Sequence, residues 1–263
     1  MTTNRQFSLS LQALTELKTE TSTPPPSGKP TIGAAPALSD VLAEIGSLPA
    51  EALFLGVATD GLPVLLNLYD SHPGPILIAG DTGSGKTAFL QTIGQSVIQT
   101  HHSSDIQFGV ITNYPDEWEN MESAPHRVGV FPVGHNSTQE FVGSLSSWAH
   151  SNKNTYQCIL LLVDDLESVA SLDPETVQNF RWLLLRGPAR RVWPIVTLNA
   201  PRYDQIISWL QNFRTRIFGR VANDSVAEAL GGNKASGLDQ LEARIQFSLR
   251  ENEDWIRFWL PSC

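Results

Sequence analysis

The octet at residues 80–87 reads G-D-T-G-S-G-K-T, and it constrains the fold of this chain more than any other stretch. An apolar run (76–79) precedes the octet and a helix-like stretch follows it. In a glycine-rich loop of this kind, backbone N–H groups point inward and surround phosphate oxygens, and the N-terminus of the following helix adds a partial positive charge. The octet therefore predicts a strand, a phosphate-binding loop and a helix in immediate succession.

The side chains of the loop have expected roles in holding a nucleotide. Lys86 is expected to reach the β- and γ-phosphates, and the hydroxyl of Thr87 is expected to hold Mg²⁺. ATP and Mg²⁺ are therefore the expected cofactors. The residues expected to contact the nucleotide are Gly80, Asp81, Thr82, Gly83, Ser84, Gly85, Lys86, Thr87 and Ala88.

Two further apolar runs end in polar residues of the kind that ATP hydrolysis needs. The first run (159–163) leads into Asp164 and Asp165. Asp164 is the expected Mg²⁺ ligand, and Asp165 stands where a carboxylate that activates water belongs; Glu167 is a second candidate for this base. The second run ends at Asn199, whose amide can hydrogen-bond the γ-phosphate or the attacking water.

Charge is unevenly distributed along the chain. The net charge of −9 argues against a nucleic-acid binder that is basic throughout. Residues 87–180 hold eleven acidic and two basic residues, whereas residues 181–220 hold eight arginines and one acid. Acidic and basic flanks can meet head to tail in a ring of identical subunits, although an ordinary solvated surface explains the pattern equally well.

Other segments alternate between strand and helix patterns, which predicts an α/β core with a mainly parallel sheet. Helices are expected at 37–48, capped near Ser39 or Asp40, at 137–150, capped by Ser137 or Thr138, and at 173–186, capped by Asp173. Strands are expected on both sides of Asp60-Gly61 and at 76–79, 106–112, 127–134, 158–163, 193–199, 214–221, 243–250 and 254–260, the last two as an antiparallel hairpin.

The N-terminal segment differs in composition from the rest. Residues 7–18 contain leucines at helical spacing, and residues 19–36 are rich in proline and small polar residues. We divide the chain into a docking helix or disordered tail (1–20), a proline-rich linker (21–36) and an ATPase domain (37–263). No run reaches the roughly 18 apolar residues of a spanning helix, and two distant cysteines suit a reducing compartment, so we expect a cytoplasmic protein without membrane insertion.

Four stretches together resemble the FtsK/HerA superfamily of ring-forming P-loop ATPases. They are GLPVLLNLYDSHPGPILIAGDTGSGKT (61–87), ILLLVDD (159–165), PIVTLNAP (194–201) and NFRTRIFGRVANDSVAEALGG (212–232). The resemblance implies a RecA-like fold and a hexameric ring, in which a neighbouring subunit supplies an arginine. Candidates for that arginine are Arg186, Arg190, Arg216 and Arg220.

The resemblance also implies a motor that moves double-stranded DNA through a central pore. Two departures bear on this: Asp165 replaces the family's glutamate and Asn199 its glutamine, each shorter by one methylene. An assembly subunit with slow hydrolysis, which docks a protein partner through residues 1–20, is the alternative. The acidic segment 113–127 is a candidate pore loop and favours that alternative. A small-molecule kinase is a weaker third hypothesis, because no lid or acceptor site is evident.

Overall fold

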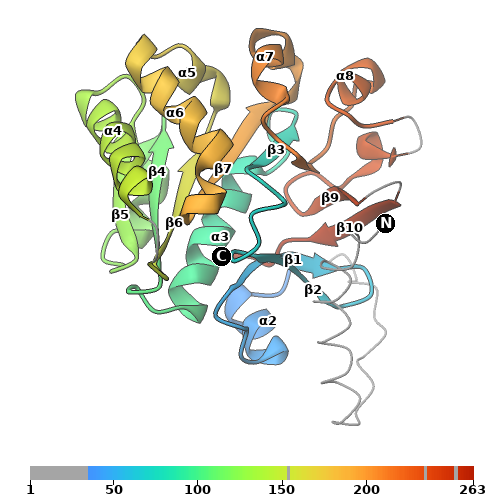
Figure 1. Cartoon of the computed structure of the whole chain (residues 1–263). Coiled ribbons are helices and arrows are strands. Elements are labelled where there is room, and N and C mark those ends of the chain that lie inside the picture. Colours follow the sequence, from blue (N-terminus) through green and yellow to red (C-terminus); the bar gives the residue numbers. More distant parts are fainter. Residues whose placement is uncertain (1–34, 153–154, 234–235, 252–253) are drawn as a thin grey trace, which may run out of the picture.

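The computed structural model describes residues 35–152, 155–233, 236–251 and 254–263. Its described residues form one sheet in the order β2-β1-β10-β9-β8-β3-β7-β6-β4-β5 (Figure 1). The strands are β1 (Ala52–Ala58), β2 (Pro63–Asn67), β3 (Ile76–Gly80), β4 (Ile106–Thr112), β5 (Arg127–Pro132), β6 (Cys158–Val163), β7 (Val192–Asn199), β8 (Thr215–Phe218), β9 (Gln246–Glu251) and β10 (Asp254–Trp259). Each strand expected from the sequence is present.

The sheet has a parallel half and an antiparallel half. Strands β5, β4, β6, β7, β3 and β8 run parallel, and β3 lies between β7 and β8. The antiparallel half begins where β8 meets β9 and continues through β10, β1 and β2. The expected RecA-like arrangement with a C-terminal hairpin is confirmed. Parallel strands direct their carboxyl ends to one edge, which is where ligands bind in such folds.

Helices cover both faces of the sheet. They are α2 (Leu38–Ile45), α3 (Lys86–Thr100), α4 (Asn136–Ser151), α5 (Leu166–Ala170), α6 (Pro174–Arg186), α7 (Ile207–Leu210) and α8 (Asp224–Ala229). The buried face of α3 packs with one set of strand side chains, including Phe247 and Phe258 of the C-terminal hairpin. Helices α4 and α6 contribute to a second cluster, centred on Leu161 and Val196, on the other face. The core therefore joins the parallel and antiparallel halves.

Two helix starts test the expected caps. The Asp173 carboxylate accepts a hydrogen bond from the Thr176 N–H at 3.0 Å, so the expected cap of α6 is confirmed. The expected cap of α4 by Ser137 or Thr138 is wrong. The helix begins one residue earlier, and the His135 ring accepts from the Ser137 N–H at 3.3 Å. A capping side chain must precede the first helical residue, and both hydroxyls lie inside the helix.

Helix α2 also begins before its expected cap. Ser39 and Asp40 lie in its first turn, and Ala37 occupies the cap position without a side-chain hydrogen bond. Tertiary contact defines this start instead, because the Leu38 N–H donates to the Ser262 carbonyl at 2.8 Å. The two ends of the described domain are therefore joined. The docking segment at 1–20 and nearly all of the linker lie outside the described residues, so their boundaries stay predictions.

The acidic segment between β4 and β5 is packed against the domain. Residues Pro115–Met121 form a 3₁₀ helix, η1, in which Trp118 and Met121 are buried. The Gln91 side chain of α3 donates to the Glu117 carbonyl at 2.8 Å. The segment therefore presents its acidic side chains from a packed turn. None of the described helices has the length and apolarity to cross a membrane.

Replacing the buried tryptophan of η1 tests this packing. We expect Trp118→Ala to lower the free energy of unfolding by about 3 kcal/mol, because a fully buried aromatic side chain leaves a cavity. Urea unfolding measures the change. Tyr114→Ala is the control, since that side chain is 65% exposed in the same segment and its loss should cost less than about 0.5 kcal/mol. Equal effects of the two substitutions would show that the segment is not packed.

Candidate functional site

The phosphate-binding loop lies at the carboxyl edge of the parallel strands. Strand β3 ends at Gly80, and α3 begins at Lys86. Gly83 and Gly85 have φ angles of 79° and 98°, the left-handed region that glycine adopts without steric cost. In register, Gly80 is opposite Asn199 of β7. The loop therefore emerges between the ends of β7 and β8, with the polar end of β7 beside it.

Lys86 folds back on the loop. Its ammonium group donates to the carbonyls of Gly80 and Asp81 at 3.0 and 2.9 Å. Burial lowers the pKa of this lysine, and the nearby carboxylates, Asp164 foremost, oppose that effect. The ammonium group is therefore held where an incoming phosphate can replace the two carbonyls as its partner.

A hydroxyl and a carboxylate adjoin at the expected Mg²⁺ position. The Thr87 hydroxyl donates to Asp164 Oδ2 at 2.9 Å, and the Thr197 hydroxyl donates to Asp164 Oδ1 at 2.9 Å. Burial raises the pKa of Asp164, while these two hydrogen bonds lower it. Oxygen donors from one hydroxyl and one carboxylate suit Mg²⁺, which takes few protein ligands and completes its shell with phosphate and water. Within the described ranges no cluster of three or more metal-binding side chains occurs, which fits this sparse kind of site.

Asp165 is held by its neighbours in a strained backbone conformation. Its φ of 93° lies in the left-handed region, which non-glycine residues seldom adopt. Its N–H donates to the Thr197 hydroxyl at 2.8 Å. Its carboxylate accepts from Ser168 at 3.0 Å, and Asn113 donates to that serine at 2.8 Å. Asp165 is thus oriented by two strands and by α5.

Glu167 lies in the site, next to the other candidate base. The first turn of α5 brings its side chain back, with only 8% of the residue exposed. Its Oε1 accepts from the Asn199 N–H at 3.3 Å, while its Oε2 is buried without a partner among the described residues. Burial, followed by interaction with the Asp165 carboxyl, raises the pKa of Glu167 to about 8. The two acids therefore form a pair that holds a proton near neutral pH.

Asn199 connects the loop with the acidic pair. Its side-chain oxygen accepts from the Thr82 hydroxyl at 3.3 Å, and its N–H contacts Glu167. An amide in this position lies within reach of the loop that would hold phosphate. The structure thus brings Lys86, Thr87 and the polar ends of β6 and β7 together, as expected from the sequence.

Thr197 was not expected from the sequence as a site residue. It links Asp164, the expected metal ligand, to Asp165, a candidate base. Its hydroxyl donates to Asp164 and accepts from the backbone of Asp165. A threonine inside an otherwise apolar buried strand, two residues before Asn199, was the signal available. A buried hydroxyl requires a partner, and that requirement points toward the neighbouring strand end.

Two of the candidate arginines lie far from the phosphate-binding loop. Arg186 ends α6 and Arg190 lies just before β7, at the amino edge of the parallel strands. Arg190 exchanges hydrogen bonds with Asn152, donating to its carbonyl at 3.4 Å and accepting from its amide at 3.1 Å. Neither residue is near the phosphate-binding loop, so neither can contact a nucleotide bound to that loop in the same chain.

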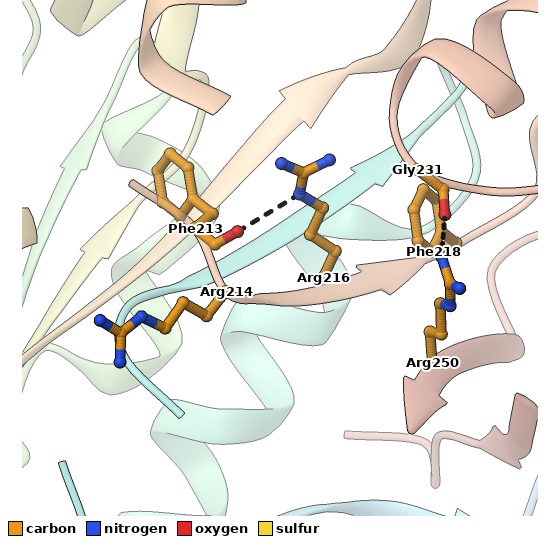
Figure 2. A pocket seen from close by; sticks show the side chains of 6 residues that line it. All are labelled: Phe213, Arg214, Arg216, Phe218, Gly231 and Arg250. Carbon is orange, nitrogen blue, oxygen red and sulfur yellow. Dashed lines mark hydrogen bonds between the residues drawn. The ribbon is translucent and has the colours of Figure 1, made fainter. Parts of the chain in front are cut away.

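Arg216 is engaged within the fold. Its guanidinium donates to three backbone carbonyls, those of Phe213, Leu230 and Leu210, at 3.3, 2.7 and 2.8 Å. Figure 2 shows the bond to Phe213. Burial lowers its pKa. These bonds hold the α7 and α8 regions on the sheet, which argues for a structural role in place of the expected catalytic one. A cavity of about 340 Å³ adjoins it, lined by Phe213, Arg214, Arg216, Phe218, Gly231 and Arg250.

The C-terminal part of the chain contacts the phosphate-binding loop on the side of β8. Asp81 donates its N–H to the Arg220 carbonyl at 2.8 Å and accepts from the Ala222 N–H at 2.8 Å. The Arg244 N–H donates to the Ser84 carbonyl at 2.9 Å. The position of Arg220 beside the loop was not evident from the sequence, because the contact depends on β8 pairing with β3.

Residues 52–138, which include the loop, match the model of the FtsK/SpoIIIE family. The similarity to the FtsK/SpoIIIE family of P-loop ATPases covers these residues, about a third of the chain. The sequence-based assignments to this superfamily and to ATPases are therefore confirmed. A search of curated proteins found no match.

Solved structures of low sequence identity share the fold. EssC (ATPases 2 and 3) from Geobacillus thermodenitrificans has a TM-score of 0.71 at 15% identity, over 91% of this chain and 48% of that one. The cytoplasmic domain of the type VII secretion ATPase EccC from Thermomonospora curvata has a TM-score of 0.65 at 16% identity, over 87% and 28%. The pCW3 conjugation coupling protein TcpA, in its monomer form with ATPγS, has a TM-score of 0.65 at 16% identity, over 97% and 82%. The chain thus spans less than half the length of the EssC and EccC chains that it matches.

The raised pKa of Glu167 predicts a pH-dependent stability. Since the folded protein binds the proton more tightly than an ordinary glutamate of pKa 4.5, this group favours folding below that value, and the benefit is lost as pH rises toward about 8. We expect the Tm of the nucleotide-free protein to fall between about pH 5 and about pH 8, and to fall less in Glu167→Gln. Glu140→Gln on the exposed face of α4 is the control. Equal slopes in wild type and Glu167→Gln would contradict the assignment.

Proposed function

We propose that this chain is an ATP-hydrolysing motor subunit that works as a hexameric ring on double-stranded DNA. The observation that carries the hydrolytic part is the convergence of Lys86, the Thr87–Asp164 pair and the Asp165–Glu167 pair at one edge of the sheet. A cation, a metal position and a base are the parts that phosphoryl transfer to water requires. They lie on neighbouring strand ends, where rigid elements hold them.

The chain's own groups divide the work of hydrolysis. Lys86 would exchange its two carbonyl partners for phosphate oxygens, and Thr87 and Asp164 would hold Mg²⁺, which would supply neutralising charge. Asn199 orients the attacking water. Asp165 accepts the proton of that water, and its position is maintained by Thr197 and Ser168.

Double-stranded DNA is the proposed substrate because of the family and the arginine distribution. FtsK/SpoIIIE-type motors act on DNA according to the resemblance stated above, and one structural neighbour is a conjugation coupling protein. Arginines between 181 and 220 can supply phosphate contacts. In a ring, Arg186 or Arg190 would reach the nucleotide of the adjacent subunit, since both lie opposite their own loop. The proposed location is the cytoplasm.

An ATP-dependent assembly subunit is the second candidate. Two observations favour it. Asp165, shorter than the family's glutamate, is hydrogen-bonded to Ser168 in a strained backbone conformation. The η1 segment, which lies within the candidate pore loop 113–127, presents acidic side chains. One of the neighbours named above, EccC, is a type VII secretion ATPase. In this candidate a protein partner docks through residues 1–20, hydrolysis is slow and nothing is translocated.

DNA stimulation distinguishes the two candidates. For the motor, we expect steady-state ATP hydrolysis at low salt to rise at least several-fold when long double-stranded DNA is added, because DNA phosphates would engage the arginines of the ring. Lys86→Ala should abolish both basal and stimulated rates. Slow hydrolysis that is indifferent to DNA, yet lost in Lys86→Ala, would replace the motor with the assembly subunit.

Substituting each acid of the pair identifies the base. We expect Asp165→Asn to lower turnover at least a hundredfold while leaving ATP affinity nearly unchanged, because an amide cannot accept the proton of water. Single-turnover hydrolysis and a binding titration measure the two effects. Glu167→Gln should keep much more of the activity. The reverse ranking would make Glu167 the base and Asp165 the residue that positions it.

A further inference from the structure

The turn before β9 lies directly against the phosphate-binding loop. The Arg244 N–H donates to the Ser84 carbonyl at 2.9 Å. A Cβ added to Gly85 would lie 2.6 Å from the Arg244 Cα, closer than real side chains approach. Gly85 therefore lacks a side chain for two reasons: its left-handed φ and the backbone of Arg244 above it. The contact joins residues that are 159 positions apart in sequence.

The backbone of Arg244 is itself strained. Its φ of 73° lies in the left-handed region, where glycine or asparagine would fit at lower cost. Strain of this kind persists where the surrounding structure imposes it, and it concentrates at ligand sites. An arginine in such a place, instead of a glycine, suggests that the side chain is used.

The guanidinium of Arg244 is exposed and available. Within the part of the chain that the structure describes, it makes no hydrogen bond and no ion pair. Arg216, by comparison, donates to three carbonyls. A long side chain that starts beside Gly85 begins next to the backbone N–H groups that surround phosphate oxygens in a loop of this kind.

The site is short of positive charge. The electrostatic environment of Lys86 contains four acidic side chains, those of Asp164, Glu167, Asp165 and Asp81. A triphosphate adds more negative charge to a partly buried site, where each unbalanced charge is costly. A second cation at the loop would favour nucleotide binding, and guanidinium matches the geometry of phosphate oxygens.

We infer that Arg244 is a nucleotide-binding residue whose guanidinium contacts a phosphate of the bound nucleotide from the C-terminal side of the loop. This inference rests on the proposed ATPase function. It gives the turn before β9 a binding role, in addition to its backbone contact with Ser84. Because β9 pairs with β8 and β10, bound phosphate would also be tied to the antiparallel half of the sheet.

Arg244→Gly is the decisive variant, because glycine keeps the left-handed backbone and removes only the side chain. We expect its affinity for a fluorescent ATP analogue to fall roughly tenfold or more, as for loss of a charge-assisted hydrogen bond. Its Tm without nucleotide should equal or exceed that of wild type. Arg244→Lys should retain part of the affinity. Arg214→Ala, which removes an exposed arginine at the far end of β8, is the control for net charge.

Competition with inorganic tripolyphosphate locates the contact. If Arg244 binds phosphate, the inhibition constant of tripolyphosphate should rise in Arg244→Gly by the same factor as the inhibition constant of ATP. An inhibition constant of tripolyphosphate that is the same in wild type and Arg244→Gly would overturn the phosphate contact. It would assign Arg244 to the adenine or the ribose of the nucleotide. Wild-type affinity in Arg244→Gly, with binding lost in Lys86→Ala, would overturn the inference alone. Absence of binding in the wild type would overturn the proposed function as well.

Discussion

The parallel pairing of β3 with β7 and β8 is the constraint on which the rest of the site depends. It places Gly80 opposite Asn199 and brings Phe218, followed by Gly219 and Arg220, alongside the start of the loop. Every polar group that serves the nucleotide then extends from a strand end or from a turn next to one. The β-branched and aromatic side chains buried on both faces of these strands keep their register, because a slip by one residue would exchange the two faces.

The single buried hydroxyl of Thr197 positions two acidic residues, Asp164 and Asp165. By donating to Asp164 and accepting from the backbone of Asp165, it aligns the proposed metal ligand and the proposed base at once. The left-handed backbone of Asp165 turns the chain so that Glu167 returns to the site. The proposed base, Asp165, is thus accompanied by a second acid, Glu167, whose raised pKa reflects burial next to the first.

Electrostatics explains why the loop is held from two sides. Lys86 alone faces several carboxylates, and its two carbonyl partners keep it in place without a nucleotide. The C-terminal part of the chain contributes backbone contacts from Arg220 and Arg244, both of which bring exposed arginines to the loop. The guanidinium of Arg216, in contrast, is hydrogen-bonded to backbone carbonyls of the same chain. Its position in an arginine-rich stretch therefore did not predict its role.

The sequence by itself determined the order of strands and helices, the phosphate-binding loop, the cap at Asp173 and the acidic end of β6, because these depend on periodicity and on residues close together in the chain. Tertiary structure decided the rest. Whether Glu167 enters the site depends on the backbone angle of Asp165, and the contact of Arg244 with Gly85 depends on antiparallel pairing between β8 and β9. The caps of α2 and α4, and the packing of Trp118, likewise follow from contacts between distant segments. Such contacts leave no local pattern, since the free energy that selects them comes from burial and hydrogen bonding across the whole sheet.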